Sequence, residues 1–407
     1  MNVNTNPKDI DKFFDHKLDK IYPSEQELRN KLLSGEKLKF YIGADATAPK
    51  LHLGHLIPIL KLKYLQELGH QIIFLIGDFT ARLGDPTDKA EVRKLLSVEE
   101  VNENASNFKN QIAKYIQFEG TDNDAMLVFN ADWHSKLTFA DVIDLASNVT
   151  VQQMIERDMF SERINSKKPI YLHEFLYPLI QGYDSVELEV DGEFGGRDQT
   201  FNMLMGRTLL KNYKNKDKFV ITTHFLLSAE GESKMSKSVG NCIFIDDKAE
   251  DKYAKVMSIP DNLIVHFYQM ATDKNSDEII AIEKRLDSGE DPMSIKKTLA
   301  FEITEAHDGT ENAHKAQKHF EDSVQNNQVP ENAPTFSRNA INSESISLKE
   351  LLAITNLLPS NAEAKRLTRS SAIEVNGEVI TDFNKEFTTA ELNNIRVGKK
   401  NWLIFKD

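Results

Sequence analysis

Two histidines stand three positions apart in the tetrapeptide His52-Leu53-Gly54-His55. An apolar run at 38–44 precedes them and apolar residues at helical spacing follow, which predicts a strand, a loop and a helix. At the start of such a helix the free N–H groups and the helix dipole favour phosphate, and Gly54 lets a flat base approach the backbone. This pattern predicts a nucleotide site, although the tetrapeptide alone also fits two histidines at the start of an ordinary helix.

A second motif is polar and rich in lysine: Lys234-Met235-Ser236-Lys237-Ser238, between Gly231 and Gly240. Lysines on a loop can stabilise the negative charge that develops on a phosphate chain during a reaction. The segment alone could be a charged surface loop. The presence of both motifs, in this order and far apart in the chain, favours a nucleotide site that both of them serve.

The elements that must position these motifs form a strand, a loop, a helix and a second strand at 71–77. This order predicts a parallel pair with a right-handed crossover, and ligands bind at the carboxyl ends of such strands. Since Pro58 is best tolerated in the first turn of a helix, the regular helix is expected to begin near His55.

Other polar residues are expected at the same edge of the sheet. Asp85 lies in a loop that leaves the second strand, although it could simply begin a turn before Pro86. A helix over 171–184 places Tyr177, Gln181 and Asp184 on one face, which could also be a solvated face. Two glycines precede another helix at 201–210, either to admit a ligand or as an ordinary helix start.

The predicted fold class is α/β, with a Rossmann-like parallel sheet in residues 1–240. One or two short helices are expected in residues 1–36, a helix at 98–118, a strand at 126–129 and two helices in 138–165. From 246 to 325 only helical patterns remain, so 241–325 is expected to be an α-helical domain. Residues 326–345 are rich in Asn, Ser and Pro, as a linker is. Residues 346–407 form a small α+β domain, with helices near 347–356 and 360–369 and a hairpin that turns at Asn376-Gly377.

Composition narrows the class of protein. At 407 residues, two or three domains are expected. No apolar run approaches membrane-spanning length and the first twenty residues are polar, so neither a membrane span nor a signal peptide is expected. The single cysteine, Cys242, excludes an internal disulfide and a cysteine-cluster metal site; with the lack of a leader, this predicts a cytoplasmic protein.

The net charge of -13 is unusual for a protein that binds RNA. From Ile346 onward, however, nine Lys or Arg stand against eight Asp or Glu. Any contact with RNA must therefore use local basic patches. The candidates are Lys365, Arg366, Arg369, Lys399 and Lys400.

From about Tyr41 to Asp407 the chain resembles the bacterial-type tyrosyl-tRNA synthetases, which belong to the class I aminoacyl-tRNA synthetases. The two motifs match the two signatures of that class, and the C-terminal domain is similar to the RNA-binding domain of ribosomal small-subunit protein four. The resemblance implies that L-tyrosine reacts with ATP to form tyrosyl-adenylate, and that tyrosine then passes to the terminal adenosine of tRNA(Tyr). It also implies Mg²⁺ on the phosphates, without dedicated protein ligands for the metal, and a homodimer formed through an insertion at about 105–165.

The resemblance also implies which residues bind tyrosine. Tyr41 and Asp184 are similar to the pair that recognises the phenol. The ammonium group is expected beside Asp85, Tyr177 and Gln181. Gln199 and Asn130 are expected near the carboxylate or the ring.

The same resemblance implies the residues that bind ATP. Gly43, Asp45, Gly196 and Asp198 are similar to the floor under ATP and its ribose, while Lys89 and Arg93 are placed near the pyrophosphate. The expected catalytic group is Thr47, His52, His55, Lys234 and Lys237, with Gly54, Met235 and Ser238 beside them in the two motifs.

The chain departs from the commonest pattern of that family at Ala44, Ala46, Glu193, Arg197 and Thr200, which concerns the shape of the pocket rather than the reaction. Three alternatives follow from the same residues. The first is a tryptophanyl-tRNA synthetase, which shares both signatures. The others are a synthetase-derived RNA-binding protein without catalysis and a nucleotidyltransferase for small molecules, although the latter leaves the C-terminal domain unexplained.

Overall fold

The computed structural model describes residues 3–47, 50–85, 97–228, 234–235, 242–325, 333–358, 360–398 and 401–407. The chain forms two compact units. The first comprises Met1–Asp247 and Lys255–Leu299, and the second comprises Lys248–Ala254 and Ala300–Asp407. Among the described residues, no helix has both the length and the apolar character needed to cross a membrane.

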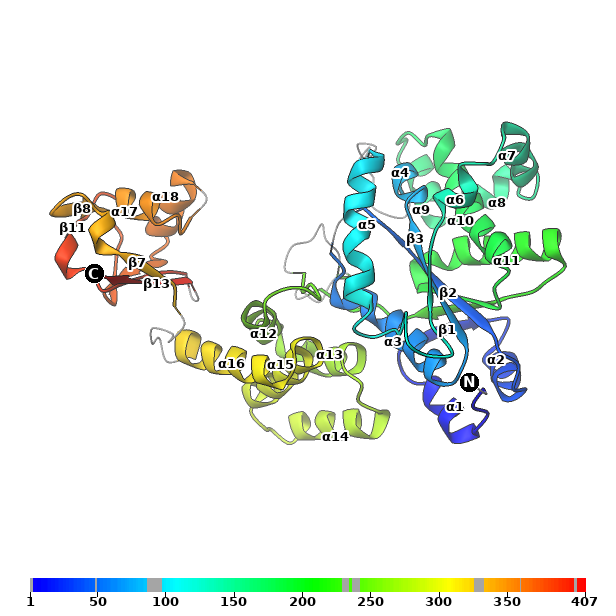
Figure 1. Cartoon of the computed structure of the whole chain (residues 1–407), viewed down its shortest axis with the longest axis horizontal. Helices are drawn as coiled ribbons and strands as arrows, with labels where there is room; N and C mark the ends of the chain where they lie inside the picture. Colours follow the sequence, from blue (N-terminus) through cyan, green and yellow to red (C-terminus); the bar gives the residue numbers. More distant parts are fainter. Residues whose placement is uncertain are drawn as a thin grey trace. The chain divides into compact units, whose positions relative to one another are not determined.

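The first unit is built on a six-stranded sheet in the order β1-β6-β5-β2-β3-β4 (Figure 1). Five neighbouring strands are parallel, which confirms the predicted Rossmann-like α/β class. Their carboxyl ends therefore meet at one edge. These strands are β2 (Lys39–Asp45), β3 (Gln71–Gly77), β4 (Met126–Phe129), β5 (Gly192–Gly196) and β6 (Phe219–Thr223).

The sixth strand, β1 (Leu18–Tyr22), is antiparallel to β6 and was not predicted. Helices alone were expected in residues 1–36, but β1 lies between α1 (Pro7–Phe13) and α2 (Glu25–Leu33). β1 is short and half-buried. It is a strand because β6, two hundred residues further along the chain, offers it an edge to pair with.

The helix after β2 begins earlier than expected. α3 runs over Leu53–Glu67, with His52 at its N-cap, so Pro58 lies inside the helix rather than in its first turn. Proline has no N–H to donate to the carbonyl four residues before it. The carbonyl of Gly54, a residue that lines the pocket described below, therefore lacks its usual partner within the helix.

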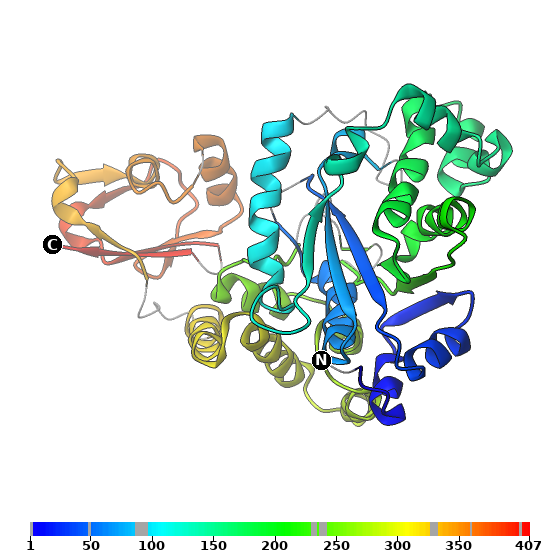
Figure 2. The ribbon, with the colours of Figure 1, turned by 45° about the vertical axis from the view of Figure 1, so that its right-hand side comes forward.

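Helices cover both faces of the sheet, with α5 (Val98–Ile112) on one side and α10 and α11 on the other (Figure 2). α10 (Leu172–Leu188) and α11 (Thr200–Lys214) pack closely because Gly182 faces Gly206. Short helices join the strands to these long ones. They are α4 (Thr80–Leu83), α6 (Ala131–His134), α7 (Phe139–Ala146), α8 (Val151–Ile155) and α9 (Asp158–Asn165), so residues 138–165 hold three helices and not the expected two.

Beyond the sheet the structure is helical up to Gln325, as predicted. The compact units do not follow the expected domain limits, because α13 and α14 lie in the unit of the sheet. α13 packs on α3, and its backbone accepts a hydrogen bond from His16 Nε2 (2.8 Å). The helices are α12 (Ala249–Met257), α13 (Ile264–Ala271), α14 (Ser276–Asp287), α15 (Pro292–Asp308) and α16 (Thr310–Phe320).

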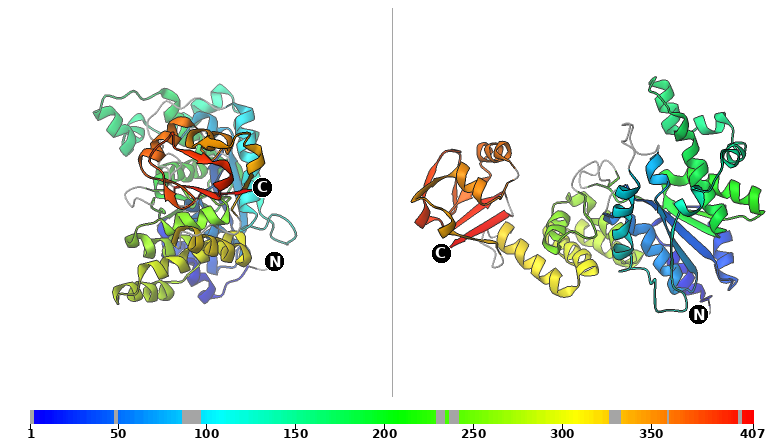
Figure 3. Two further views of the ribbon diagram at one scale, coloured as in Figure 1. Left: turned by 90° about the vertical axis from the view of Figure 1, so that its left-hand side faces the viewer. Right: turned by 45° about the horizontal axis from the view of Figure 1, so that its top comes forward.

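The end of the chain is an α+β fold with its own sheet, in the order β10-β9-β12-β13-β7, and a separate pair of β11 with β8. Helices α17 (Leu348–Ile354) and α18 (Asn361–Arg369) lie on one face of the sheet, over a core that includes Leu351, Ala364 and Ile395 (Figure 3). The strands are β7 (Thr335–Ser337), β8 (Ser345–Ser347), β9 (Ile373–Val375), β10 (Glu378–Val379), β11 (Glu386–Thr388), β12 (Asn394–Val397) and β13 (Asn401–Lys406).

Part of the expected linker belongs to this fold. β7 lies within 326–345 and pairs in parallel with β13, the last strand of the chain. Composition could not reveal this, because a three-residue strand gains its order from its partner rather than from its own sequence.

Candidate active site

One pocket in the first unit brings both sequence motifs together at the carboxyl edge of the sheet. The histidines reach it from the start of α3, and Lys234 and Met235 reach it from the second motif. Most of the predicted site residues line it: Tyr41, Gly43, Asp45, Thr47, His52, Gly54, His55, Asp85, Tyr177, Gln181, Asp184, Gly196, Asp198, Gln199, Lys234 and Met235.

Some predicted residues lie elsewhere. Lys89, Arg93, Lys237 and Ser238, and in the C-terminal domain Lys399 and Lys400, lie outside the described residues. Asn130, which was expected near the carboxylate or the ring, has no exposed surface and is not in the pocket lining. Its side chain serves instead as a support behind the pocket wall.

The two histidines are held against each other. Their rings lie 3.8 Å apart between centroids, and the backbone N–H of His52 donates to Nδ1 of His55 (3.1 Å). That bond occupies the Nδ1 atom of His55 and fixes the orientation of its ring. The pair therefore presents imidazole groups at the positive end of α3, where a phosphate is favoured.

Lys234 lies across the pocket and forms an ion pair with Asp198. The backbone N–H of the next residue, Met235, donates to the carbonyl of Leu226 (2.7 Å), which fixes this part of the motif. This ion pair joins Lys234, which is expected at the phosphates of ATP, to Asp198, which is expected at its ribose. Gly196 makes room for it, because a Cβ at that position would lie 2.6 Å from Oδ1 of Asp198.

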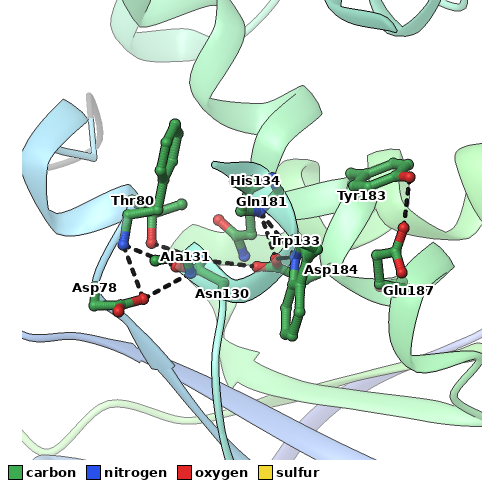
Figure 4. Close-up of polar contacts among 12 residues, drawn as sticks. Asp78, Thr80, Asn130, Ala131, Trp133, His134, Gln181, Tyr183, Asp184 and Glu187 are labelled. Atoms are coloured by element: carbon green, nitrogen blue, oxygen red, sulfur yellow. Dashed lines mark hydrogen bonds and ion pairs between the residues drawn. The ribbon is translucent and has the colours of Figure 1, made fainter. Parts of the chain in front are cut away.

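Asp184 is buried at the inner wall of the pocket and is held by three donors (Figure 4). Its Oδ1 accepts from Trp133 Nε1 (2.9 Å) and lies 2.7 Å from His134 Nε2. Its Oδ2 accepts from Asn130 Nδ2 (3.3 Å). Because a carboxylate oxygen can accept two hydrogen bonds, Oδ2 keeps a position for a donor from the pocket. Burial raises the pKa of Asp184, while the bonds from His134, Trp133 and Asn130 act in the opposite direction.

Tyr41 lies beside Asp184 in the lining, and its hydroxyl is 3.0 Å from Ser185 Oγ. Burial raises the pKa of Tyr41 well above its usual value, and the negative charges of Glu193 and Asp184 add to this. Tyr41 therefore keeps its proton and can act as a donor. Tyr41 and Asp184 together offer one donor and one acceptor, which is what a phenol hydroxyl requires.

Asp45 ends β2 in the middle of the pocket. Its carboxylate accepts from Thr80 Oγ1 (2.6 Å) and from the hydroxyl of Tyr177 (2.9 Å). Burial raises the pKa of Asp45 to about 7, against the lowering effect of these two bonds. Gly77 permits the arrangement, since a Cβ there would lie 2.1 Å from Oδ1 of Asp45.

A chain of amides connects the remaining residues. Gln199 donates to Asp85 (2.6 Å), and Asn202 Nδ2 donates to both Gln199 (3.0 Å) and Gln181 (2.8 Å). Gln181 in turn donates to Glu193 (3.5 Å). Asp85, Gln181 and Gln199, three of the residues predicted to surround the ammonium and carboxylate groups of tyrosine, thus belong to one hydrogen-bonded network.

Sequence reasoning missed Thr80, which lines the pocket, and the residues behind the pocket wall. Thr80, Trp133 and His134 follow strands β3 and β4, and their position near a strand end was the one signal available. Ser185 is adjacent to Asp184 in α10, and nothing in its own context distinguished it from an ordinary helix residue. Lys218 lies in a lysine-rich stretch, and nothing in that stretch indicated a buried side chain.

In the second unit, the predicted basic residues Lys365, Arg366 and Arg369 are exposed on α18. Arg366 forms an ion pair with Glu363 on the same helix. A pair of this kind at the surface contributes little energy, so the guanidinium can exchange its partner for a phosphate group.

Comparison with known proteins identifies the family of the chain. The family model of class I tRNA synthetases (W and Y) matches residues 33–325, and that of the tyrosine–tRNA ligase SYY-like C-terminal domain matches residues 325–405. The tyrosine–tRNA ligase of Moorella thermoacetica is 41% identical over 384 residues, which cover 93% of this chain and 91% of the relative. That of Oleidesulfovibrio alaskensis is 42% identical over 380 residues, which cover 93% of this chain and 94% of the relative.

A solved structure shares the fold. The tyrosyl-tRNA synthetase of Archaeoglobus fulgidus, complexed with L-tyrosine, aligns with a TM-score of 0.59 at 21% identity and covers 76% of this chain and 99% of its own. The C-terminal match, which is to tyrosine–tRNA ligases, sets aside the tryptophanyl alternative. By its two family matches and its near full-length relatives, the chain belongs to the tyrosine–tRNA ligases of class I.

Proposed function

We propose that this pocket is the place where the chain carries out its tyrosine–tRNA ligase activity. The observation that carries the proposal is the meeting, in one pocket, of both signature motifs with the donor and acceptor pair of Tyr41 and Asp184. The first step joins L-tyrosine to ATP as tyrosyl-adenylate, and the second passes tyrosine to the terminal adenosine of tRNA(Tyr).

The phenol of tyrosine fits between Tyr41 and Asp184. Tyr41 donates to the phenol oxygen, and the phenol proton goes to Oδ2 of Asp184, which accepts one bond from Asn130. Phenylalanine lacks the hydroxyl and would leave both buried groups unpaired, which costs binding free energy. The ammonium group then lies near Asp85, Tyr177 and Gln181, and the carboxylate near Gln199.

In the first step a carboxylate oxygen of tyrosine attacks the α-phosphorus of ATP. A bond forms between them, the bond from the α-phosphorus to the bridging oxygen breaks, and pyrophosphate leaves with the negative charge. No general base is needed, because the carboxylate is already ionised. His52, His55, Lys234 and Thr47 line the region where that charge develops, and donors placed there stabilise the transition state more than the ground state.

Lys234 can stabilise the transition state only after ATP has bound. In the free pocket it is paired with Asp198, and arriving phosphates offer it a more highly charged partner. Its departure frees Asp198 to bond the ribose. Lys237, Lys89 and Arg93 are assigned to the phosphates from the sequence alone, and Ser238 with them.

Mg²⁺ enters with ATP as part of the substrate. Among the described residues no group of three or more His, Cys, Asp or Glu side chains could hold a metal ion. Bound to ATP, Mg²⁺ would take its oxygen ligands from the phosphates and from water, as is usual for a nucleotide-bound magnesium ion.

A homodimer is proposed from the apolar surface of the insertion and of the start of α10, which follows it. Phe139 is 81% exposed and Leu172 is 79% exposed, and Ile143, Val151, Ile164 and Tyr171 are exposed as well. Large apolar side chains exposed in one stretch of chain mark an interaction surface. A second copy of the chain is its proposed partner, since soluble oligomers are mostly symmetric homodimers.

The domains expected from the sequence are proposed as functional divisions. Residues 1–240 activate tyrosine, 241–325 form the anticodon-side helical domain, and 346–407 bind tRNA(Tyr) through the exposed basic face of α18. A cytoplasmic location is part of the same proposal, since the tRNA substrate is used where proteins are made.

Pyrophosphate exchange tests the proposal. The full-length protein, given radiolabelled pyrophosphate, ATP and each amino acid in turn, should form ATP with tyrosine and not with phenylalanine or tryptophan. Tyr41→Phe and Asp184→Asn should reduce the selectivity. Equal exchange with phenylalanine would show that the pocket does not recognise a phenol.

A further inference from the structure

A fully buried lysine lies directly behind Tyr41. Lys218 immediately precedes β6, and its side chain has no exposed surface. Its ammonium group forms an ion pair with Glu193 and donates to Ser185 Oγ (2.6 Å). Burying an ammonium group is costly unless it is paired, so a function behind the pocket would explain why this fold keeps one there.

The chemistry of these groups fixes the direction of their hydrogen bonds. An ammonium group has three donors and no acceptor, so Ser185 must accept the bond from Lys218. The hydroxyl of Ser185 then has its own proton to give, and the oxygen of Tyr41 lies 3.0 Å away. If Ser185 donates to that oxygen, the proton of Tyr41 must point elsewhere, either to a ligand in the pocket that Tyr41 lines or to Glu193.

Glu193 is the group that could divert this proton. It lines the pocket, and both its negative charge and a hydrogen bond with the phenol raise the pKa of Tyr41. Lys218 neutralises that charge through the ion pair. The lysine thus acts on Tyr41 in two ways, by directing Ser185 and by weakening the competing acceptor.

The surrounding backbone leaves room for this arrangement. Gly206, on α11, faces the network, and a Cβ there would lie 2.7 Å from Lys218 Nζ and 2.7 Å from Ser185 Oγ. The ammonium group therefore occupies the space that any larger residue at this position would fill.

We propose that Lys218 and Ser185 are positioning residues for substrate selection, which hold Tyr41 as a hydrogen-bond donor toward the phenol oxygen of tyrosine. Neither side chain lines the pocket. The proposal rests on the assignment of Tyr41 to the phenol made above, and it adds the reason why Tyr41 donates rather than accepts.

The test is amino-acid-dependent pyrophosphate exchange by the full-length enzyme. Ser185→Ala removes the hydroxyl between Lys218 and Tyr41 without adding volume. We expect KM for tyrosine to rise about threefold to tenfold, the scale of one hydrogen bond, with kcat changed less than about twofold. The kcat/KM for phenylalanine should stay the same, so the selectivity falls by the same factor.

Thr272→Val, which deletes a buried hydroxyl that bonds the backbone of α13 (2.6 Å) away from the pocket, is the matched control.

A double variant removes the ion pair without leaving a buried charge. Glu193→Gln with Lys218→Met should lower the ratio of tyrosine to phenylalanine activity as Ser185→Ala does. An unchanged ratio in Ser185→Ala, while Tyr41→Phe lowers it, would overturn the role of Lys218 and Ser185 and leave the phenol site intact. If Tyr41→Phe also leaves the ratio unchanged, the phenol site itself is wrongly assigned.

Discussion

Asp184 shows how one carboxylate is prepared for a single ligand. Oδ1 is occupied by Trp133 and His134, and among the described residues Oδ2 accepts from Asn130 alone. These bonds determine that Oδ2, and not Oδ1, is the oxygen that faces the substrate. Three donors offset part of the cost of burying the charge, and the pKa of Asp184 is raised because burial outweighs their lowering effect.

Asp184→Asn should weaken tyrosine binding about tenfold or more, the scale of a hydrogen bond to a charged group. To keep an oxygen toward Trp133 and His134, the amide must place its NH₂ where Oδ2 was, so that it faces the NH₂ of Asn130 and the phenol proton. Equilibrium dialysis with labelled tyrosine measures this, with the exposed neighbour Asp132→Asn as control. Equal affinities in the two variants would remove Asp184 from the phenol site.

Asp45→Asn should make the first unit more stable at high pH. The pKa of Asp45 in the fold is raised to about 7, so the folded protein binds a proton that the unfolded chain releases at lower pH. The stability that this proton contributes is fully present below the pKa of the unfolded chain and is lost as the pH rises to about 7. The free energy of unfolding of the variant, relative to that of the wild type, should therefore increase by about 1–4 kcal/mol from pH 4 to pH 8.

The measurement for Asp45 is urea unfolding followed by the fluorescence of Trp133, in a Trp402→Phe background that leaves one tryptophan. The chain has two compact units, and Trp133 reports on the one that holds Asp45. A difference between variant and wild type that does not change with pH would contradict the raised pKa.

At the scale of elements, the pair α10 and α11 controls the pocket. α10 carries Tyr177, Gln181 and Asp184 on one face, while Gly182 on the same helix meets Gly206 of α11. The close approach of the two backbones therefore sets the depth at which those three side chains lie.

Gly182→Ala should separate these helices. A Cβ at this position would lie 3.0 Å from the backbone nitrogen of Gly206 and 3.2 Å from its Cα, and backbone cannot move aside as a side chain can. We expect a loss of about 1–3 kcal/mol from overpacking, which exceeds the gain in helix propensity of about 1 kcal/mol, together with a higher KM for tyrosine. Thr208→Ala, exposed on α11, is the control. Unaltered stability and KM would show that the helices can part without cost.

At the scale of the whole molecule, two surfaces are left to partners: the apolar insertion and the basic face of α18. One is hydrophobic and the other charged, so salt should separate their effects. Apolar association is little weakened by moderate salt, whereas contact with phosphate groups is weakened strongly.

Phe139→Asp with Leu172→Asp should convert the proposed homodimer into a monomer, because each carboxylate would have to be buried unpaired in the interface. Light scattering at micromolar concentration gives the mass. Ile280→Asp with Met293→Asp replaces two apolar residues that are exposed elsewhere in the same unit and should leave the dimer intact. A monomeric wild type, or a dimeric Phe139 and Leu172 variant, would count against this interface.

Lys365→Ala with Arg369→Ala should impair tRNA charging and leave pyrophosphate exchange unchanged, because the pocket lies in the other unit. If each residue contacts one phosphate, the slope of the logarithm of the tRNA binding constant against the logarithm of the salt concentration should become shallower by about two. Lys8→Ala with Lys12→Ala, on α1, removes the same charge from another surface. Normal charging by the first variant at physiological salt would exclude this face as a tRNA contact.

The sequence by itself determined the local patterns and the chemistry they carry. The two motifs, the strands at 71–77 and 126–129, the shared face of Tyr177, Gln181 and Asp184, and the hairpin turn at Asn376-Gly377 depend on residues close in sequence. Periodicity, turn residues and residue type are enough to predict such features. The structure reproduces the strands at these bounds and gives both turn residues a positive φ.

Only the tertiary structure decided which distant residues support the site. β1 and β7 became strands because partners far along the chain offered them an edge. Asn130 was expected at the ligand but lies behind the wall of the pocket. Lys218, in a lysine-rich stretch of sequence, is fully buried beside Glu193 and Ser185. The physical reason is that burial and pairing depend on what surrounds a side chain in space, and a residue's neighbours in sequence do not determine this.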